Sequence, residues 1–320
     1  METPAGIRYF TFALAAFAIA IGNAGGQLPK RQPDGVQLGA FLFEGEAKFP
    51  HHGSRGIKAF ERLVERKLDS VLWYKTWDDP FPTVDAKVVQ SGGATPHITW
   101  ELYWPSVNAD NSRPVDAAET GLDAVLRGEH DEYIDRFAKE GAQFGGEVYI
   151  RFLHEFNGNW YTWGGNKNGR ERGGPQKVAK VWRYVVDRCR AQGADNFVWV
   201  WCAHAPSNEV SEERWNRLKE YWPGADYVDW IGVDAYNWYP KDPWGNERPF
   251  RSFDQLMKGI YAECAKLDGD KPIMIAETGT GEFKRGRDDK ARWISEMFED
   301  LERYPKIKML VWFHIKKELD

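Results

Sequence analysis

Eight short runs rich in β-branched and aromatic residues recur along the chain, and amphipathic segments separate most of them. The runs are Val36–Phe43, Ser70–Thr76, His97–Tyr103, Glu147–His154, Asn196–Ala203, Val228–Ala235, Pro272–Ala276 and Ile307–Phe313. Several are almost continuously apolar, which is typical of strands that are buried on both faces. The clearest amphipathic segments are Gly56–Lys67, His130–Gly141, Pro175–Gln192, Phe253–Leu267 and Asp288–Tyr304. This alternation predicts an α/β fold with a parallel sheet.

The number of repeats favours one closed barrel over an open sheet. Eight strand and helix repeats in a chain of 320 residues fit a single (β/α)8 TIM barrel. No Gly-x-Gly-x-x-Gly motif follows the first run, which argues against a dinucleotide-binding fold. Functional residues of such barrels lie at the C-terminal ends of the strands. We therefore expect the chemistry where the predicted strands end.

The N-terminal segment predicts a secretory signal peptide over residues 1–24. A short region ending at Arg8 precedes the apolar run Tyr9–Ile21, and small residues around Ala24 allow cleavage. The run is too short to span a bilayer comfortably, although an uncleaved anchor is the alternative. Residues 25–35 then form a short linker and residues 36–320 the catalytic domain. We expect a secreted protein, extracellular or periplasmic, that leaves the membrane after cleavage.

Charge and composition restrict the partners. The net charge is −5 and no long Lys/Arg run is present, which argues against a nucleic-acid partner. Aromatic residues make up 15% of the chain, and 16 of them are Trp, whose flat faces stack well on sugar rings. Cys189, Cys202 and Cys264 are irregularly spaced, which favours buried free thiols, with one disulfide as the alternative. No cluster has metal-ligand spacing, so neither metal nor cofactor is predicted.

Two glutamates stand at the ends of predicted strands. Glu155 follows the fourth strand and precedes an aromatic-rich loop, and Glu277 directly follows the apolar run Ile273–Ala276. Either one alone could be an ordinary loop carboxylate. Together they would face each other across the barrel mouth, as the nucleophile and the acid/base of a retaining glycosidase do. An apolar pocket and the charge of the second carboxylate are expected to raise the pKa of the acid.

The segment Arg151–Gly164 resembles the acid/base signature of glycoside hydrolase family 26, R-x-x-H-E-x-N-G-x-W-[FY]-x-W. Trp230–Tyr236, Lys271–Glu277 and Val311–Phe313 resemble the sixth, seventh and last strands of that family, so the similarity runs from about residue 36 to the end. The resemblance implies a (β/α)8 barrel of the retaining clan, with Glu155 as acid/base and Glu277 as nucleophile.

The resemblance also implies residues that bind substrate. His154 would bind the sugar next to the cleaved bond, Tyr236 would hydrogen-bond the nucleophile, and Trp312 would form the aromatic floor of the central subsite. The walls of the cleft would come from Trp160 and Trp163. Other candidates near strand ends are Asn157, Trp104, His204 and Trp238.

Two charged residues within predicted strands are also candidates for the site. Arg151 shares a strand face with Glu155, so it should point into the barrel and pair there with an acidic residue. Glu101, in the third strand, is a candidate for a third carboxyl group near the site.

The expected function is that of a monomeric, secreted, retaining endo-β-glycanase that degrades a plant-type polysaccharide, with β-1,4-mannan as the expected substrate. Phe152 and Tyr161 are nearer to the β-glucanase-like members of the family, so mixed-linkage β-1,3-1,4-glucan and xylan stay open as substrates. A barrel that only binds polysaccharide would be expected to lack Glu155 or Glu277. The Pro105–Arg127 and Tyr239–Phe250 stretches are candidates for closing one end of the cleft, as exo action would require.

Overall fold

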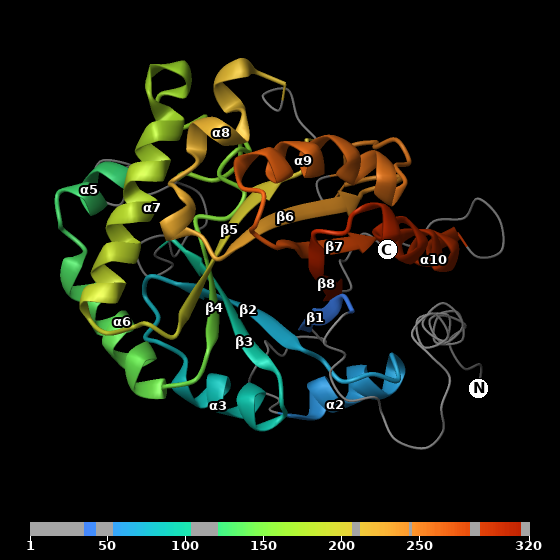
Figure 1. Cartoon of the computed structure of the whole chain (residues 1–320), viewed down its shortest axis with the longest axis horizontal. Coiled ribbons are helices and arrows are strands. Elements are labelled where there is room, and N and C mark those ends of the chain that lie inside the picture. The colour runs from blue at the N-terminus through green and yellow to red at the C-terminus, as the bar shows by residue number, and fades with distance from the viewer. Residues whose placement is uncertain are drawn as a thin grey trace.

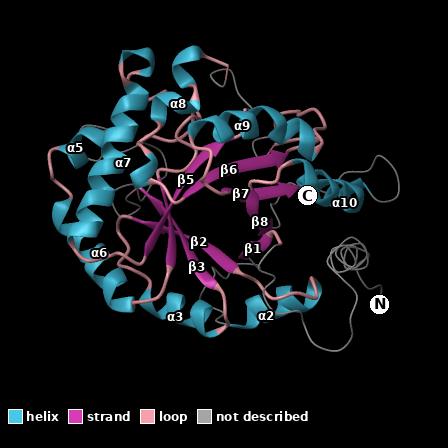
Figure 2. Cartoon of the chain, viewed as in Figure 1, coloured by secondary structure: helices cyan, strands magenta, loops and turns pink. Residues whose placement is uncertain are grey.

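Eight parallel strands close into a barrel in sequential order, and helices surround them (Figures 1 and 2). The computed structural model describes residues 35–42, 54–103, 121–206, 212–242, 245–281 and 289–314. The predicted signal peptide, residues 25–34 of the predicted linker, and Trp104 lie outside the described residues. None of the helices in the described ranges is both long and apolar enough to cross a membrane.

The strands confirm the predicted barrel. They are β1 (Gln37–Leu42), β2 (Ser70–Thr76), β3 (Thr95–Glu101), β4 (Val148–Phe152), β5 (Phe197–His204), β6 (Trp230–Asn237), β7 (Ile273–Thr280) and β8 (Ile307–His314). Each strand pairs in parallel with the next, and β1 pairs with β8 to close the sheet. The single (β/α)8 TIM barrel expected from the alternating pattern is therefore present.

Helices follow most strands. They are α2 (Ser54–Leu63), α3 (Thr83–Ser91), α5 (Leu122–Leu126), α6 (Asp131–Phe144), α7 (Gly174–Ala191), α8 (Leu218–Tyr221), α9 (Phe253–Leu267) and α10 (Asp289–Asp300). Short 3-10 turns lie at Arg170–Arg172, Arg214–Asn216, Ala225–Tyr227 and Leu301–Arg303. All five predicted helical segments are confirmed. The start of α9 is well defined because Ser252 and Gln255 form a capping box.

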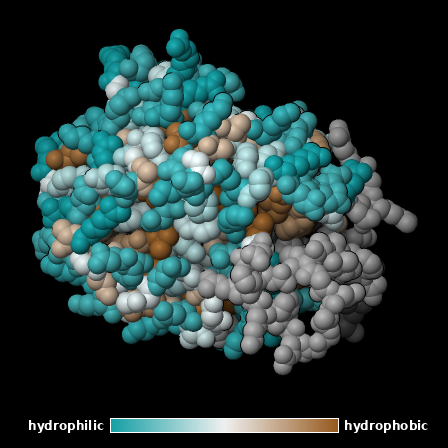
Figure 3. All heavy atoms as spheres, in the orientation of Figure 1, coloured by the Kyte–Doolittle hydropathy of each residue, from teal (hydrophilic) through white to brown (hydrophobic). Residues whose placement is uncertain are grey.

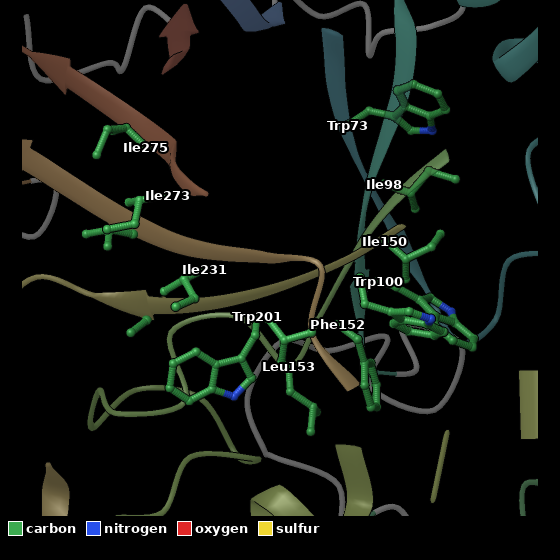
Figure 4. Packing of buried hydrophobic residues seen from close by; sticks show 14 of the residues in the cluster. Trp73, Ile98, Trp100, Ile150, Phe152, Leu153, Trp201, Ile231, Ile273 and Ile275 are labelled. Carbon is green, nitrogen blue, oxygen red and sulfur yellow. The ribbon is translucent and has the colours of Figure 1, made fainter. Parts of the chain in front are cut away.

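Side chains alternate between the two faces of each strand and so build two cores. One core lies between the strands and the helices, where Figure 4 shows Trp100 and Phe152 near each other. Their ring centroids are 5.5 Å apart. The other fills the barrel interior and includes Leu72, Val200 and Met274. The face seen in Figure 3 is mostly hydrophilic, with apolar residues in small separate patches. All three cysteines are buried and free, as expected.

The chain leaves β4 earlier than predicted. The strand was expected to reach His154 but ends at Phe152, because Leu153 has a φ of 46°. Glu155 also has a positive φ, of 53°, and its backbone N–H donates to the carbonyl of Cys202 on β5 at 2.9 Å. Positive φ values are uncommon for residues other than glycine and often mark functional turns. This sharp turn directs Glu155 over the mouth of the barrel.

A β-bulge redirects the end of β7. Val233 pairs with Ile275, but the next residue, Asp234, pairs with Glu277, so Ala276 is the extra residue of the bulge. Ala276 faces the barrel interior, and in a regular strand Glu277 would face the helices. The bulge instead places Glu277 on the inner face beside Asp234.

Candidate active site

A cavity of about 630 Å³ lies at the C-terminal mouth of the barrel, and both Glu155 and Glu277 line it. This volume is within the range of small-molecule sites. Aromatic side chains form much of the wall: Tyr74, Trp160, Tyr161, Tyr236, Trp238 and Phe313. The two carboxylates predicted to carry the chemistry therefore share one aromatic cleft.

Glu277 is held by an array of donors. Among the described residues, Tyr236 donates its hydroxyl to Oε2 at 2.5 Å, and the Tyr74 hydroxyl and Arg151 Nη2 both donate to Oε1. The side chain of Glu277 is 6% exposed. A cation and two phenols thus complement its negative charge and fix its orientation. The hydrogen bond from Tyr236, implied by the family resemblance, is present.

Arg151 links the nucleophile candidate to a buried ionic network. Its Nη1 donates to both carboxylate oxygens of Asp234, at 2.8 and 2.9 Å, and its Nε donates to Thr99 Oγ1 at 2.9 Å. The side chains of Arg151 and Asp234 are both 0% exposed. Although burial disfavours the cation, the charges of Asp234 and Glu277 raise the pKa of Arg151 well above its usual value. The predicted pairing of Arg151 with acidic neighbours inside the barrel is confirmed.

Glu155 has a different environment. His204 Nδ1 lies 2.8 Å from Oε1, and Trp160 donates its indole N–H to Oε2 at 2.7 Å. Burial alone would raise the pKa of Glu155, but the charge and hydrogen bond of His204 outweigh it, and the pKa is lowered to about 2. The expected rise in the pKa of Glu155 is therefore wrong. The reason is the pairing with His204, which could not be foreseen from the chain positions.

Four of the predicted substrate-binding residues line the cavity: Trp160, His204, Tyr236 and Trp238. Tyr236 and Trp238 stack with their ring centroids 4.5 Å apart, so they form a continuous aromatic surface that starts at Glu277. Such surfaces suit the apolar faces of sugar rings.

His154 and Trp163 lie behind the cavity wall, contrary to the expectation. His154 is 1% exposed, and its Nε2 lies 2.9 Å from the hydroxyl of Tyr161. Burial lowers the pKa of His154 to about 3, so its ring is neutral. Trp163 stacks on Tyr161 with centroids 4.2 Å apart and donates to the His154 carbonyl. Tyr161 is the residue that lines the cavity, and the other two support it.

Asn157 and Trp312 also do not line the cavity. The amide of Asn157 bonds to both the N–H and the carbonyl of His204, each at 2.8 Å, so it positions that histidine. Trp312 belongs to the outer core, because strand alternation turns it toward the helices. Its neighbour Phe313 lines the cavity instead and stacks on Phe41 with centroids 4.3 Å apart.

Several site residues escaped the sequence analysis. Tyr74 and Phe313 could have been found from the period of two along their strands, since each shares a face with interior residues. Arg248 and Arg251 also line the cavity, but they lie in an irregular loop where no pattern marks them.

Glu101 lies where the sequence suggested. It shares the inner face of β3 with Thr99, which contacts Arg151. Burial raises the pKa of Glu101 to about 7; the charge of Arg151 opposes this rise, and the charges of Glu277 and Glu155 add to it.

Comparison with known proteins agrees with this geometry. The model of glycosyl hydrolase family 26 matches residues 66–277, more than half of the chain. Endoglucanase H of Acetivibrio thermocellus is 34% identical over 269 residues, which are 82% of this chain and 27% of that protein. Mannan endo-1,4-beta-mannosidase of Bacillus subtilis is 31% identical over 137 residues, 41% of this chain and 30% of that protein. The chain thus spans less than a third of either relative.

Solved structures share the fold. The catalytic domain of the GH26 endo-beta-1,4-mannanase from Bacillus sp. JAMB-750 superposes with a TM-score of 0.64 at 17% identity. The superposition covers 97% of this chain and 83% of that domain.

Proposed function

Because the chain belongs to glycoside hydrolase family 26, and so is a glycoside hydrolase, we propose that it is a retaining endo-β-glycanase with Glu277 as nucleophile and Glu155 as acid/base. The observation that carries this proposal is that both carboxylates line one cavity but have different kinds of hydrogen-bond partner. Glu277 is held by a cation and two phenols, and Glu155 by an imidazole and an indole. Two carboxyl groups in different environments suit the two roles of this mechanism.

In the first step, an oxygen of Glu277 attacks the anomeric carbon, and the bond from that carbon to the leaving oxygen breaks. Glu155 gives its proton to the leaving oxygen, and a glycosyl ester of Glu277 remains. Glu277 loses its negative charge in this step. Arg151 nevertheless keeps a buried counter-ion, because its Nη1 stays bonded to Asp234.

In the second step, Glu155 takes a proton from a water molecule, and the water oxygen attacks the anomeric carbon. The ester bond breaks, Glu277 is released, and the product keeps the β configuration.

The contact between Glu155 and His204 supplies a route for the acid proton. When His204 is protonated, its Nδ1 proton lies along a 2.8 Å contact to Oε1 of Glu155. Transfer along this contact yields the carboxylic acid that the first step consumes. Asn157 holds the backbone of His204 in place for this contact.

The substrate we propose is a β-glucan, with β-1,4-mannan second, which reverses the order expected from the sequence alone. Similarity to endoglucanase H extends over 82% of the chain, whereas similarity to the mannosidase extends over 41%. Phe152 and Tyr161, which are nearer to the β-glucanase-like members of the family, also favour a glucan. We also propose that the protein is secreted and acts as a monomer; the N-terminal signal-like pattern supports the secretion.

Reducing-sugar release from barley β-glucan, lichenan, mannan, galactomannan and xylan tests the proposal, with Glu155→Ala and Glu277→Ala beside the wild type. We expect activity on a glucan or a mannan that falls by orders of magnitude in both variants. Absence of activity on all five polymers, or activity that survives Glu277→Ala, would contradict the assignment.

A further inference from the structure

Part of the cavity wall carries two arginines that have no part in the proposed reaction. Two arginines among the described lining residues, Arg248 and Arg251, follow β6 and lie in the same cavity as Glu155 and Glu277. Tyr236 contacts Glu277 and stacks on Trp238, the first residue of the loop that carries both arginines. The described lining of the cavity therefore combines three carboxylates, those of Glu155, Glu277 and Asp242, with two arginines.

Arg251 is fixed in place, and one edge of its guanidinium has no hydrogen-bond partner among the described residues. Its backbone N–H donates to Asn237 Oδ1 at 3.1 Å, and its backbone carbonyl accepts from Trp293 Nε1 at 2.8 Å. Its Nη1 donates to the carbonyl of Pro206 at 2.8 Å. Within the described chain, Nε and Nη2 have no hydrogen-bond partner. These two nitrogens form the side-on edge that grips a carboxylate with two parallel hydrogen bonds.

Arg248 is fixed by a buried carboxylate. Its Nε and Nη2 lie 2.8 and 2.6 Å from Oδ2 of Asp242, whose side chain is 1% exposed. Asn246 also donates to Asp242 through its backbone and side-chain nitrogens. The backbone N–H of Arg248 donates to the carbonyl of Pro240 at 2.8 Å. Asp242 thus holds Arg248 in position, and donors already occupy its oxygens.

At Arg248 and Arg251 the cavity wall therefore presents guanidinium groups, which are hydrogen-bond donors. Neutral sugars offer hydroxyl groups, which both donate and accept, and sites for them usually mix the two kinds of partner. A guanidinium has five donors and no acceptor, and its planar fork matches a carboxylate. The carboxylate on this side of the cavity, Asp242, is already bonded to Arg248 and Asn246.

We infer that Arg248 and Arg251 form a subsite for a uronic acid, a sugar that carries a carboxylate, so the enzyme accepts β-glycans with acidic units. This inference rests on the proposed function. The free edge of Arg251 would bind the carboxylate, and Arg248 would add positive charge beside it. The neighbouring Trp238 would pack against the sugar ring.

A matched pair of ligands tests this subsite: a neutral cello-oligosaccharide, and the same oligosaccharide with glucose C6 oxidised to the carboxylate of glucuronic acid. Calorimetric titration into Glu155→Ala measures binding without turnover. We expect the acidic ligand to bind roughly tenfold more tightly, which corresponds to about 1.4 kcal/mol, because hydrogen bonds between two charged groups are stronger than those between neutral groups. The preference should shrink as salt is added.

Arg251→Gln, in the same Glu155→Ala background, should bring the affinity for the acidic ligand down to that for the neutral one. Arg190→Gln is the matched control. Arg190 also donates to a backbone carbonyl, that of Asp226, but it is exposed near the end of α7, at the opposite face of the barrel. The control should keep the full preference. Equal binding of the two ligands, or a preference that survives Arg251→Gln, would overturn the inference.

The titration also separates this inference from the proposed function. If the wild type cleaves no polymer but the acidic ligand binds more tightly in an Arg251-dependent way, the proposed function fails and the subsite stands. If the polymers are cleaved but the two ligands bind equally, the proposed function stands and the subsite fails.

Discussion

Asp234→Asn removes one negative charge from the barrel interior while it keeps the size and shape of the side chain. In the wild type, Arg151 Nη1 donates to both oxygens of Asp234, at 2.8 and 2.9 Å, and Cys202 Sγ lies 3.2 Å from Oδ1. Asparagine has a single oxygen, and its amide N–H groups would meet the N–H groups of the guanidinium. The substitution therefore replaces a buried ion pair with a neutral group that keeps one acceptor and adds donors facing the guanidinium.

The expected cost follows from the burial of the pair. Both side chains are 0% exposed, and removing one partner of a buried ion pair costs about 3–5 kcal/mol. Arg151 keeps Glu277 and Thr99 as partners, so we expect the lower end, about 3 kcal/mol. At roughly 2–4 °C per kcal/mol, the Tm should fall by about 6–12 °C. In the variant, Glu277 would be the main counter-ion of Arg151. When Glu277 becomes a neutral ester, Arg151 would lose that counter-ion, so the activation free energy should rise and kcat should fall by about 10²-fold.

Thermal unfolding followed by circular dichroism, together with kcat on the preferred glycan, measures both effects. Asp135→Asn is the matched control, because Arg188 bridges Asp135 and Asp131 much as Arg151 bridges Asp234 and Glu277. Arg188 and Asp135 are 26% and 22% exposed, so the control should cost about 0–1 kcal/mol. Burial raises the pKa of Asp234, which favours its neutral form. If the carboxyl were neutral, replacing it with Asn would change stability and activity little. Unchanged Tm and kcat in Asp234→Asn would therefore refute the ionic account.

Three further substitutions address side chains in the cavity wall or near it. Burial raises the pKa of Glu101 from 4.5 to about 7, so the folded protein keeps a proton that the unfolded chain loses between these pH values. The wild type should therefore lose up to about 3 kcal/mol of stability as the pH rises through this range, and Glu101→Gln should not. Urea unfolding of both proteins at about pH 5 and about pH 8 measures this difference. Trp160→Phe removes the indole N–H that lies 2.7 Å from Glu155 Oε2, which should raise the pKa of Glu155 and shift the pH profile of kcat/KM to higher pH. An unchanged pH profile would contradict this. Tyr236→Phe removes the hydroxyl 2.5 Å from Glu277, which should lower kcat by about 10²-fold with little change in Tm. An unaltered kcat would exclude a role of this hydroxyl in stabilising the nucleophile.

The barrel could be predicted because its strands are buried on both faces and so appear as apolar runs between amphipathic helices. Helix α3 was missed because its buried face consists of Ala86 and Val89 alone, too little for a clear pattern. The inward direction of Arg151 could be predicted, since β4 is regular up to that point and alternation holds.

The directions of the site side chains were harder to predict. The position of Glu277 at a strand end was clear, but its inward direction depends on the bulge at Ala276, which no residue type announces. Alternation along β8 could have separated Trp312 from Phe313, because only Phe313 shares the inner face with Val311. The pairing of Glu155 with His204 joins the turn after β4 to the end of β5, so it could be recognised only in the folded structure.

The central claim is that Glu277 forms a covalent bond with the sugar. The most direct test is to incubate the wild type with an activated 2-deoxy-2-fluoro-β-glycoside of the preferred sugar and to digest it for mass spectrometry. The fluorine destabilises the oxocarbenium-like transition states, so the glycosyl ester should accumulate. We expect a mass increase of one fluoroglycosyl group on the peptide that contains Glu277, and none in Glu277→Gln. A label on Glu155 or elsewhere, or an unlabelled protein that releases product of inverted configuration, would contradict the account.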